Sequence, residues 1–298
     1  LYAMYATDFE TAVDEAEKVR ELDPEYFKAW LPVAVKAMSD GDTGMAREAY
    51  TNMQAAGTRG ELTAQLGLAD AETYAGDFSA AVELFEAGVG MAEAAGSSYY
   101  EATMRIGLAE AMLLAGKDSA AVTNAILEAL DASGGLSRQI PAALLYLANG
   151  ETVSAKLIAD SLGQNLQPQN RAYAALINGL LARHAGDSVA AVESISAGIE
   201  LADLWLLRFY RGIAYLEAGY AAEALDDLTA CYERRGEASS VFLDDLPTWR
   251  YMATLPYWQG RAQQELGMLH DARQNFMTFA ARRPEGDALG DDARQRSR

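Results

Sequence analysis

Residues 69–81, ADAETYAGDFSAA, contain the pattern on which the fold prediction depends. A small residue, Ala69, stands seven positions before Gly76, and a second small residue, Ala81, stands five positions after it. The glycine suits a sharp turn because it has no Cβ and adopts positive φ readily. The flanking small residues suit two helices that cross closely beside that turn. We therefore expect a helix hairpin centred on Gly76.

The same pattern recurs along nearly the whole chain. The turn glycines are Gly41, Gly76, Gly116, Gly150, Gly186, Gly219 and Gly267. Successive glycines are 35, 40, 34, 36, 33 and 48 residues apart; each has Ala five positions later and Ala or Gly seven positions earlier. A recurrence of about 34 residues is typical of stacked two-helix repeats. We predict an all-α solenoid superhelix of about seven to eight helix hairpins.

The predicted hairpins follow from the turn positions. They lie near residues 25–56, 60–95, 97–132, 137–166, 168–201, 203–235 and 247–283, after a partial unit at 1–23. Pro32 and Pro141 each stand nine residues before a turn glycine, so each predicts a bend or a late helix start. The solenoid domain thus covers residues 1–283, and residues 284–298 form a polar C-terminal tail.

An insertion at residues 236–246 accounts for the longest interval. It contains the apolar run Val241-Phe242-Leu243 and the acidic pair Asp244-Asp245. Insertions in solenoids often map to the functional face. The alternative is a loop whose apolar residues cap the last groove of the array.

The layout resembles the tetratricopeptide repeat (TPR) family. Residues 75–81 (AGDFSAA) and 218–224 (AGYAAEA) match its turn and second helix, and Pro24 and Pro284 match the proline near the end of its motif. The resemblance implies that first helices line a concave face and that recognition residues adjoin the small position before the turn.

The resemblance also excludes one binding mode. Some members hold a peptide's C-terminal carboxylate with paired Lys and Asn side chains. The corresponding positions here hold Leu66 and Asp70, Ile106 and Glu110, Leu176 and Leu180, or Phe209 and Ile213. That carboxylate clamp is therefore absent from this sequence.

The C-terminal third is similar to TPR arrays that follow a Ser/Thr kinase, a cyclase or a winged-helix regulator in bacterial multidomain signalling proteins. The residues that carry this similarity are 234–238 (RRGEA), 242–245 (FLDD), 247–248 (PT), 250–251 (RY), 255–256 (LP), 260–263 (GRAQ) and 292–294 (DAR). An attached N-terminal domain is implied, and the start of the chain within an expected helix also favours one.

The composition disfavours several classes of binding partner and indicates a cellular location. The formal charge of −19, from 43 acidic and 24 basic residues, disfavours nucleic acid and anionic membranes as partners; a GC-rich or salt-adapted host explains the charge equally well. No apolar run approaches the roughly 18 residues of a membrane helix, so no membrane insertion is expected. The single cysteine, Cys231, indicates a reducing, cytoplasmic location.

Catalytic patterns are not found. The two histidines, His184 and His270, form no zinc or Cys/His spacing with Cys231, and the carboxylates are scattered along expected helix faces. Five aspartates, Asp8, Asp42, Asp77, Asp118 and Asp187, stand where second helices begin and are expected to cap them. We predict no enzyme, no cofactor and no metal.

The predicted partner-binding residues lie near the C-terminus, where Trp, Tyr and Arg concentrate. These residue types dominate interface hot spots. The predicted set is Trp205, Arg208, Arg211, Tyr215, Trp249, Arg250, Tyr257 and Arg261. The alternative is that the aromatic side chains fill the core and the arginines neutralise local acid. If the set binds a partner, charge reversal at Arg208 or Arg211 should spare folding and weaken binding.

The sequence therefore predicts a non-catalytic protein-interaction scaffold, part of a larger bacterial signalling protein, that binds a peptide or protein on its concave face. The alternative function is a small-ligand sensor whose change of curvature regulates an attached kinase, cyclase or DNA-binding domain. A pocket that mixes aromatic and arginine side chains would favour the sensor.

Overall fold

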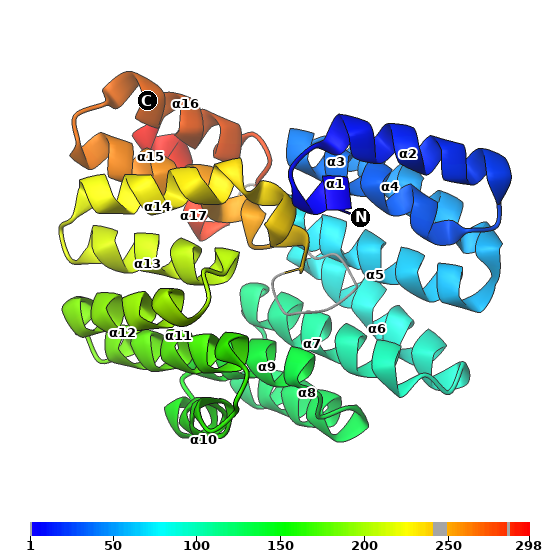
Figure 1. Ribbon diagram of the computed structural model, residues 1–298, viewed down its shortest axis with the longest axis horizontal. Coiled ribbons are helices and arrows are strands. Elements are labelled where there is room, and N and C mark those ends of the chain that lie inside the picture. The colour runs from blue at the N-terminus through cyan, green and yellow to red at the C-terminus, as the bar shows by residue number, and fades with distance from the viewer. Residues whose placement is uncertain (1, 241–248, 285–286) are drawn as a thin grey trace. The chain divides into compact units, whose positions relative to one another are not determined.

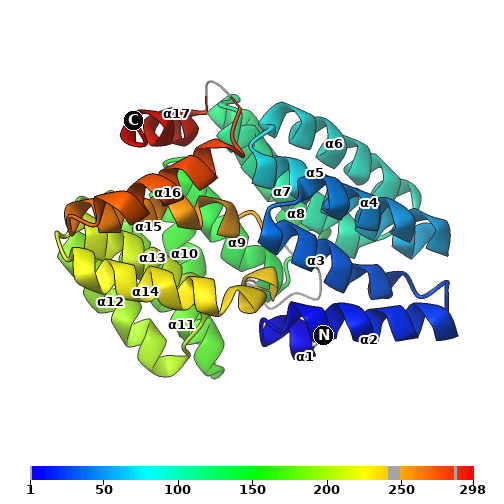
Figure 2. The ribbon, with the colours of Figure 1, turned by 90° about the horizontal axis from the view of Figure 1, so that it is seen from above.

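The computed structural model describes residues 2–240, 249–284 and 287–298, and these contain helices and no strand. The predicted all-α class is confirmed. Figures 1 and 2 show the helices as antiparallel neighbours joined by short turns. The chain divides into two compact units: unit 1 comprises residues 1–138 and 234–252, and unit 2 comprises residues 139–233 and 253–298.

Unit 1 begins with the partial repeat and continues with three helix hairpins. Its helices are α1 (Tyr2–Tyr5), α2 (Phe9–Leu22), η1 (Phe27–Trp30), α3 (Leu31–Asp40), α4 (Thr43–Met53), η2 (Gln54–Ala56), α5 (Gly57–Ala75), α6 (Phe78–Ala94), α7 (Ser98–Leu114), α8 (Ser119–Ala132) and η3 (Arg235–Ser240). The helix α9 (Leu136–Ala148) spans the boundary between the units.

Unit 2 continues the hairpins. Its helices are α10 (Thr152–Gly163), α11 (Pro168–His184), α12 (Ser188–Leu201), α13 (Trp205–Glu217), α14 (Ala221–Glu233), α15 (Leu255–Glu265), α16 (Leu269–Ala280) and α17 (Ala288–Arg296), and η4 (Met252–Thr254) spans its second boundary. The observed helix pairs fall within the predicted hairpins, except that α5 begins three residues and α9 one residue before the predicted range. Part of the predicted polar tail forms α17, whose Ala293 is buried against Tyr257 and Phe279.

The close crossing within each hairpin has the geometry that the small residues predict. A Cβ added to Gly179 of α11 would lie 2.6 Å from Ile195 Cγ1 and 3.0 Å from the carbonyl oxygen of Ala191 on α12. The equivalent Ala34, Ala69, Ala109 and Ala143 are fully buried. The crossing at Gly179 therefore has no room for a Cβ, and the equivalent positions of the other hairpins hold no side chain larger than Ala.

The turns and helix starts also follow the sequence pattern. The seven turn glycines have φ between 67° and 86°, a left-handed conformation that favours glycine. Each of the five predicted aspartates accepts a hydrogen bond from a backbone N–H in the first turn of a second helix, as Asp77 does from Ala80 at 3.1 Å. The capping prediction is confirmed.

The two prolines behave differently. Pro32 lies in the first turn of α3, after the 3-10 helix η1, so the predicted late start is confirmed there. Pro141 lies inside α9, which begins five residues earlier at Leu136, so a late start at Pro141 is wrong.

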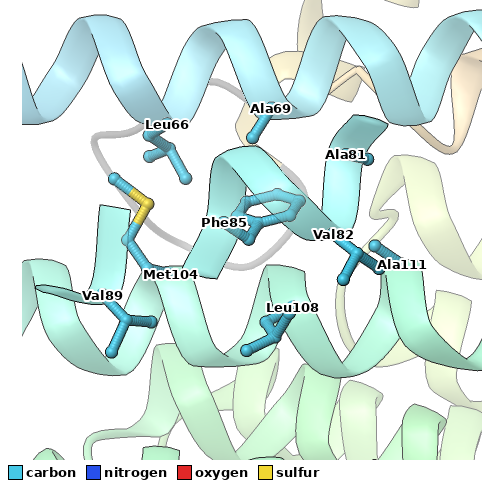
Figure 3. Packing of buried hydrophobic residues seen from close by; sticks show 9 residues of the cluster. All are labelled: Leu66, Ala69, Ala81, Val82, Phe85, Val89, Met104, Leu108 and Ala111. Atoms are coloured by element: carbon cyan, nitrogen blue, oxygen red, sulfur yellow. The ribbon is translucent and has the colours of Figure 1, made fainter. Parts of the chain in front are cut away.

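Successive hairpins are held together by apolar side chains of the second helices. Figure 3 shows Phe85 of α6 between α5 and α7, in a cluster with Leu66 and Met104. Phe85 is fully buried, and a Cβ at Gly107 of α7 would lie 2.3 Å from its ring. The core is thus a series of small clusters, each formed by neighbouring helices.

The insertion after α14 belongs to unit 1, and we call residues 234–252 the strap. Gly236 donates its N–H to Thr7 Oγ1 at 3.0 Å, and Arg235 Nε donates to Ser39 Oγ at 3.0 Å. A Cβ at Gly236 would lie 2.1 Å from the carbonyl oxygen of Met4, so glycine is required at this contact. The predicted features Val241-Phe242-Leu243 and Asp244-Asp245 lie outside the described residues.

The crossing can be tested with two helical glycines that differ only in their surroundings. Gly179→Ala should destabilise the protein by about 1–3 kcal/mol through overpacking. Gly90→Ala in α6, where an added Cβ meets nothing within 4 Å, should stabilise it by up to about 1 kcal/mol because Ala favours helix. Urea unfolding of both variants measures the contrast; a stabilising Gly179→Ala would contradict it.

Candidate functional site

The eight predicted partner-binding residues are divided between the two units. They occupy three places: Trp205, Arg208, Arg211 and Tyr215 on α13, Trp249 and Arg250 on the strap, and Tyr257 and Arg261 on α15. The first and third groups belong to unit 2 and the second to unit 1. Each group therefore has to be assessed within its own unit.

Two of the aromatic side chains in unit 2 are buried and have structural contacts. Trp205 stacks on Phe209 with ring centroids 5.3 Å apart and donates its indole N–H to the carbonyl oxygen of Cys231 at 2.8 Å. Tyr257 donates its hydroxyl to Asp292 at 2.8 Å, which joins α15 to α17. Both side chains stabilise packing between helices and expose almost no surface to a partner.

Arg208 and Arg211 both pair with Asp227 of α14, whose side chain is 4% exposed. Arg211 donates to both carboxylate oxygens, at 2.6 and 2.8 Å, and its guanidinium lies over the ring of Tyr215. The hydrogen bonds with Asp227 raise the pKa of Arg211 above its ordinary value. These contacts match the alternative interpretation, in which the arginines neutralise local acid.

The pairing changes the expected effect of charge reversal. Arg211→Glu would place a second carboxylate beside the buried Asp227, so we expect a loss of about 2–3 kcal/mol of unfolding free energy, less than a fully broken buried pair because Arg208 remains. The ion pairs with Asp227 therefore lead to the opposite expectation from the sequence, which predicted that charge reversal spares folding. Arg273→Glu, at an exposed site on α16, is the matched control, and thermal or urea unfolding gives the comparison.

If Arg211→Glu unfolds with the wild-type midpoint, Asp227 has another compensating partner and the structural role of Arg211 is overturned.

On the strap, Arg250 forms a buried ion cluster with two first helices of unit 1. Its Nε lies 2.8 Å from Asp70 Oδ1 on α5, and its Nη1 lies 2.7 Å from Glu110 Oε2 on α7. The side chains of Arg250 and Asp70 are 6% and 2% exposed. Trp249 is buried beside this cluster and donates its backbone N–H to Asp70 Oδ2 at 2.8 Å. A single cation thus faces two carboxylates.

Burial shifts the pKa of a carboxyl group and the pKa of a guanidinium group in opposite directions. It raises the pKa of the Glu110 carboxyl, and the nearby Asp70 raises it further, against the opposing effect of Arg250. Burial alone would lower the pKa of Arg250, but Glu110 and Asp70 outweigh it and the pKa rises. Arg250 is therefore charged at every accessible pH, whereas Glu110 takes up a proton more readily than a free carboxyl.

This cluster predicts a pH effect. Because the pKa of Glu110 is higher in the folded state, its contribution to stability is fully present below the unfolded value of about 4.3 and is lost as the pH rises through the folded value. The unfolding free energy of Glu110→Gln relative to wild type should therefore fall as the pH falls from 7 toward about 4.5.

Urea unfolding across this range measures the difference, and Glu233→Gln on the exposed side of α14 is the control for loss of one charge. A relative stability that rises on acidification would contradict the direction of the Glu110 pKa shift.

Unit 2 has a hollow of about 570 Å³ beside three consecutive first helices, and we call it the first-helix groove. Its lining residues are Leu144, Leu147, Ala148, Asn149, Gly150, Leu180, Arg183, His184, Tyr210 and Glu217. They come from α9 and the turn after it, from the end of α11, and from α13. The groove therefore joins three repeats.

The groove combines an apolar lining with a charged bridge. Leu144, Leu147 and Leu180 present the small exposed parts of otherwise buried side chains. Arg183 of α11 makes two hydrogen bonds to Glu217 of α13, both at 2.7 Å, with both side chains about one-third exposed. These hydrogen bonds raise the pKa of Arg183. The arrangement offers apolar contact next to groups that donate and accept hydrogen bonds.

Sequence reasoning missed most of this groove. Of its residues, only Leu180 stood at a position that the family resemblance singled out. A signal was present, since Leu144, like Leu180, directly follows the small residue of the crossing. In unit 1 the same register holds Asp70 and Glu110, and the remaining hairpins hold Val35, Ile213 and Arg261. The residue after the small position thus differs in chemistry from hairpin to hairpin.

The described residues contain neither a cluster of metal-ligating side chains nor a membrane-spanning helix. In residues 2–240, 249–284 and 287–298, no three His, Cys, Asp or Glu side chains gather as a metal site. None of the helices in these ranges has the length and apolar character needed to cross a membrane.

Comparison with known proteins gives structural neighbours only. No protein-family model and no curated protein matches the chain. The APC/C hetero-tetramer Cut9-Hcn1 contains a chain that matches with a TM-score of 0.52 and 13% identity over 100% of this chain and 54% of its own. A tetratricopeptide repeat protein from Parabacteroides merdae matches with a TM-score of 0.48 and 15% identity over 91% of this chain and 98% of its own.

A further neighbour is the TPR2AB domain of yeast Sti1 in complex with pHSP90, with a TM-score of 0.36 and 14% identity over 91% of this chain and 96% of its own. At such identities the likeness concerns the fold. Together with the helix-hairpin repeat, the match to Cut9-Hcn1 supports an all-α fold of stacked helix hairpins.

Proposed function

We propose that this protein is a non-catalytic interaction scaffold that binds a peptide or a protein segment in the first-helix groove. The observation that carries the proposal is the groove itself, which three consecutive first helices line and which combines leucine side chains with an Arg183–Glu217 bridge. Binding surfaces of repeat proteins extend over neighbouring repeats in this way.

The groove's chemistry describes the partner. An apolar side chain of the partner would contact Leu144 and Leu180, because burying it there removes apolar surface from water on both sides. The main-chain groups of the partner would exchange hydrogen bonds with Arg183 and Glu217, which carry donors and acceptors at the rim. Tyr210 would supply the rigid aromatic contact that commonly dominates interface energy.

The wider context is also a proposal. We infer that the chain works in the cytoplasm as part of a larger bacterial signalling protein with an attached N-terminal domain. The similarity of residues 234–238 and 260–263 to arrays of that kind supports this inference, as does the single cysteine. The structural neighbour Cut9-Hcn1 is a hetero-tetramer, and assembly with a different protein is the kind of role that we propose here.

A small-ligand sensor is the second candidate. The groove's volume of about 570 Å³ lies within the roughly 300–1,000 Å³ typical of small-molecule sites. Its lining mixes Tyr210, Arg183 and His184 with leucines, which suits an anionic or amphipathic metabolite. Thermal-shift screening of a metabolite library would favour this function if one compound stabilised the wild type and not a groove variant.

The peptide-binding proposal is tested by selecting binders from a displayed random peptide library. A selected peptide should lose at least about tenfold in affinity to Tyr210→Ala, the loss expected for an interface hot spot. Tyr232→Ala is the matched control, because Tyr232 lies half-exposed on the second helix α14 of the same unit. Isothermal titration calorimetry measures both affinities.

Selected peptides that bind both variants as tightly as the wild type would place the binding surface elsewhere and overturn the assignment of the groove. Circular dichroism melts of the two variants show whether any loss of affinity reflects loss of folding.

A further inference from the structure

The strap presents an arginine side chain to the first helices of unit 1. Arg250 reaches Asp70 on α5 and Glu110 on α7, which lie 180 and 140 residues earlier in the chain. Its guanidinium carbon lies 5.8 Å from the centroid of the Phe85 ring. The side chain is thus surrounded by two carboxylates from neighbouring repeats and one aromatic ring.

This set of contacts is selective for a guanidinium group. A guanidinium is a planar fork whose N–H groups diverge, so it can donate to two carboxylates on different helices and also lie over a ring. A lysine ammonium is a compact point charge and cannot match both carboxylates and the ring in one position. The geometry therefore distinguishes arginine from lysine.

The guanidinium of Arg250 compensates two carboxylates that packing removes from water. The side chains of Asp70 and Glu110 are 2% and 13% exposed. Without a cation, two like charges would face each other in an environment that stabilises neither. A guanidinium group therefore stabilises the cluster strongly, whichever chain segment supplies it.

The contacts of Trp249 and Arg250 are of the kind that a bound peptide makes, through both its main chain and its side chains. Asp70 accepts the backbone N–H of Trp249 and pairs with the Arg250 side chain, so one carboxylate contacts the main chain and the side chain of consecutive residues. Trp249 packs near Phe9 with ring centroids 6.1 Å apart. The indole N–H of Trp249 is buried and has no acceptor among the described residues. Buried donors usually have one, so Trp249 does not satisfy all the polar groups of this contact.

We propose that Asp70, Glu110 and Phe85 form a recognition site for an arginine side chain of a partner protein segment, and that Arg250 fills this site in cis until the partner's arginine displaces it. The site lies in unit 1, and the proposal does not rest on the first-helix groove. Arg250 belongs to the same chain as the site, which gives it a high effective concentration and keeps weak competitors out.

The experiment uses the full chain with Arg250→Ala and two probes, the dipeptides acetyl-Trp-Arg-amide and acetyl-Trp-Lys-amide. By calorimetry, Arg250→Ala should bind the arginine dipeptide at least about tenfold more tightly than the lysine dipeptide, and at least about tenfold more tightly than the wild type does. Adding Glu110→Gln to Arg250→Ala should weaken the arginine dipeptide by at least about tenfold. Arg273→Ala should behave as the wild type.

Equal affinity of Arg250→Ala for the two dipeptides, or affinity unchanged by Glu110→Gln, would overturn the proposal. If Arg250→Ala does not fold, Arg250→Lys replaces it, because it keeps one cation in the cluster. The arginine dipeptide should then raise the melting temperature of Arg250→Lys and the lysine dipeptide should not. The absence of such a shift would equally overturn the proposal.

Discussion

The close crossing of the two helices in each hairpin is the constraint on which the rest of the structure depends. At Gly212 an added Cβ would lie 2.9 Å from Leu228 and 3.3 Å from the carbonyl oxygen of Ala224, so the helix axes can approach only when both crossing positions are small. This approach brings the apolar residue further along the second helix, such as Leu228 or Phe85, into the space before the next hairpin. Each hairpin therefore forms the packing surface of its successor.

The parts of the fold that sequence predicts are those whose contacts are local. The turn glycines, the small crossing residues and the capping aspartates all act within about one repeat length, so their spacing is visible in the sequence. The strap is different, because the contacts of Gly236 with Thr7 and of Arg250 with Asp70 join residues that no repeat relates. The boundary between the two units inside α9 has no sequence signal either, since the repeat pattern continues through it.

The candidate site was harder to predict than the fold because interfaces and cores use the same residue types. Trp205 and Tyr257 are large amphipathic side chains that find hydrogen-bond partners inside unit 2. In a chain with 43 acidic and 24 basic residues, many arginines form ion pairs with carboxylates of the same chain. What distinguishes a structural arginine from a binding one is the burial of its partner, as at Asp227, and burial depends on packing that a single sequence does not display.

One register position nevertheless connects the sequence to both candidate sites. The residue after the small crossing position is acidic at two hairpins of unit 1 (Asp70, Glu110) and leucine at two hairpins of unit 2 (Leu144, Leu180), whereas the other three hairpins have Val35, Ile213 and Arg261. In unit 1 Asp70 and Glu110 hold the guanidinium of Arg250, and in unit 2 Leu144 and Leu180 line the first-helix groove. The close crossing requires a small side chain at the neighbouring position and does not set the chemistry of this one. The same helix-hairpin repeat can in this way carry acidic side chains at one pair of repeats and apolar side chains at another.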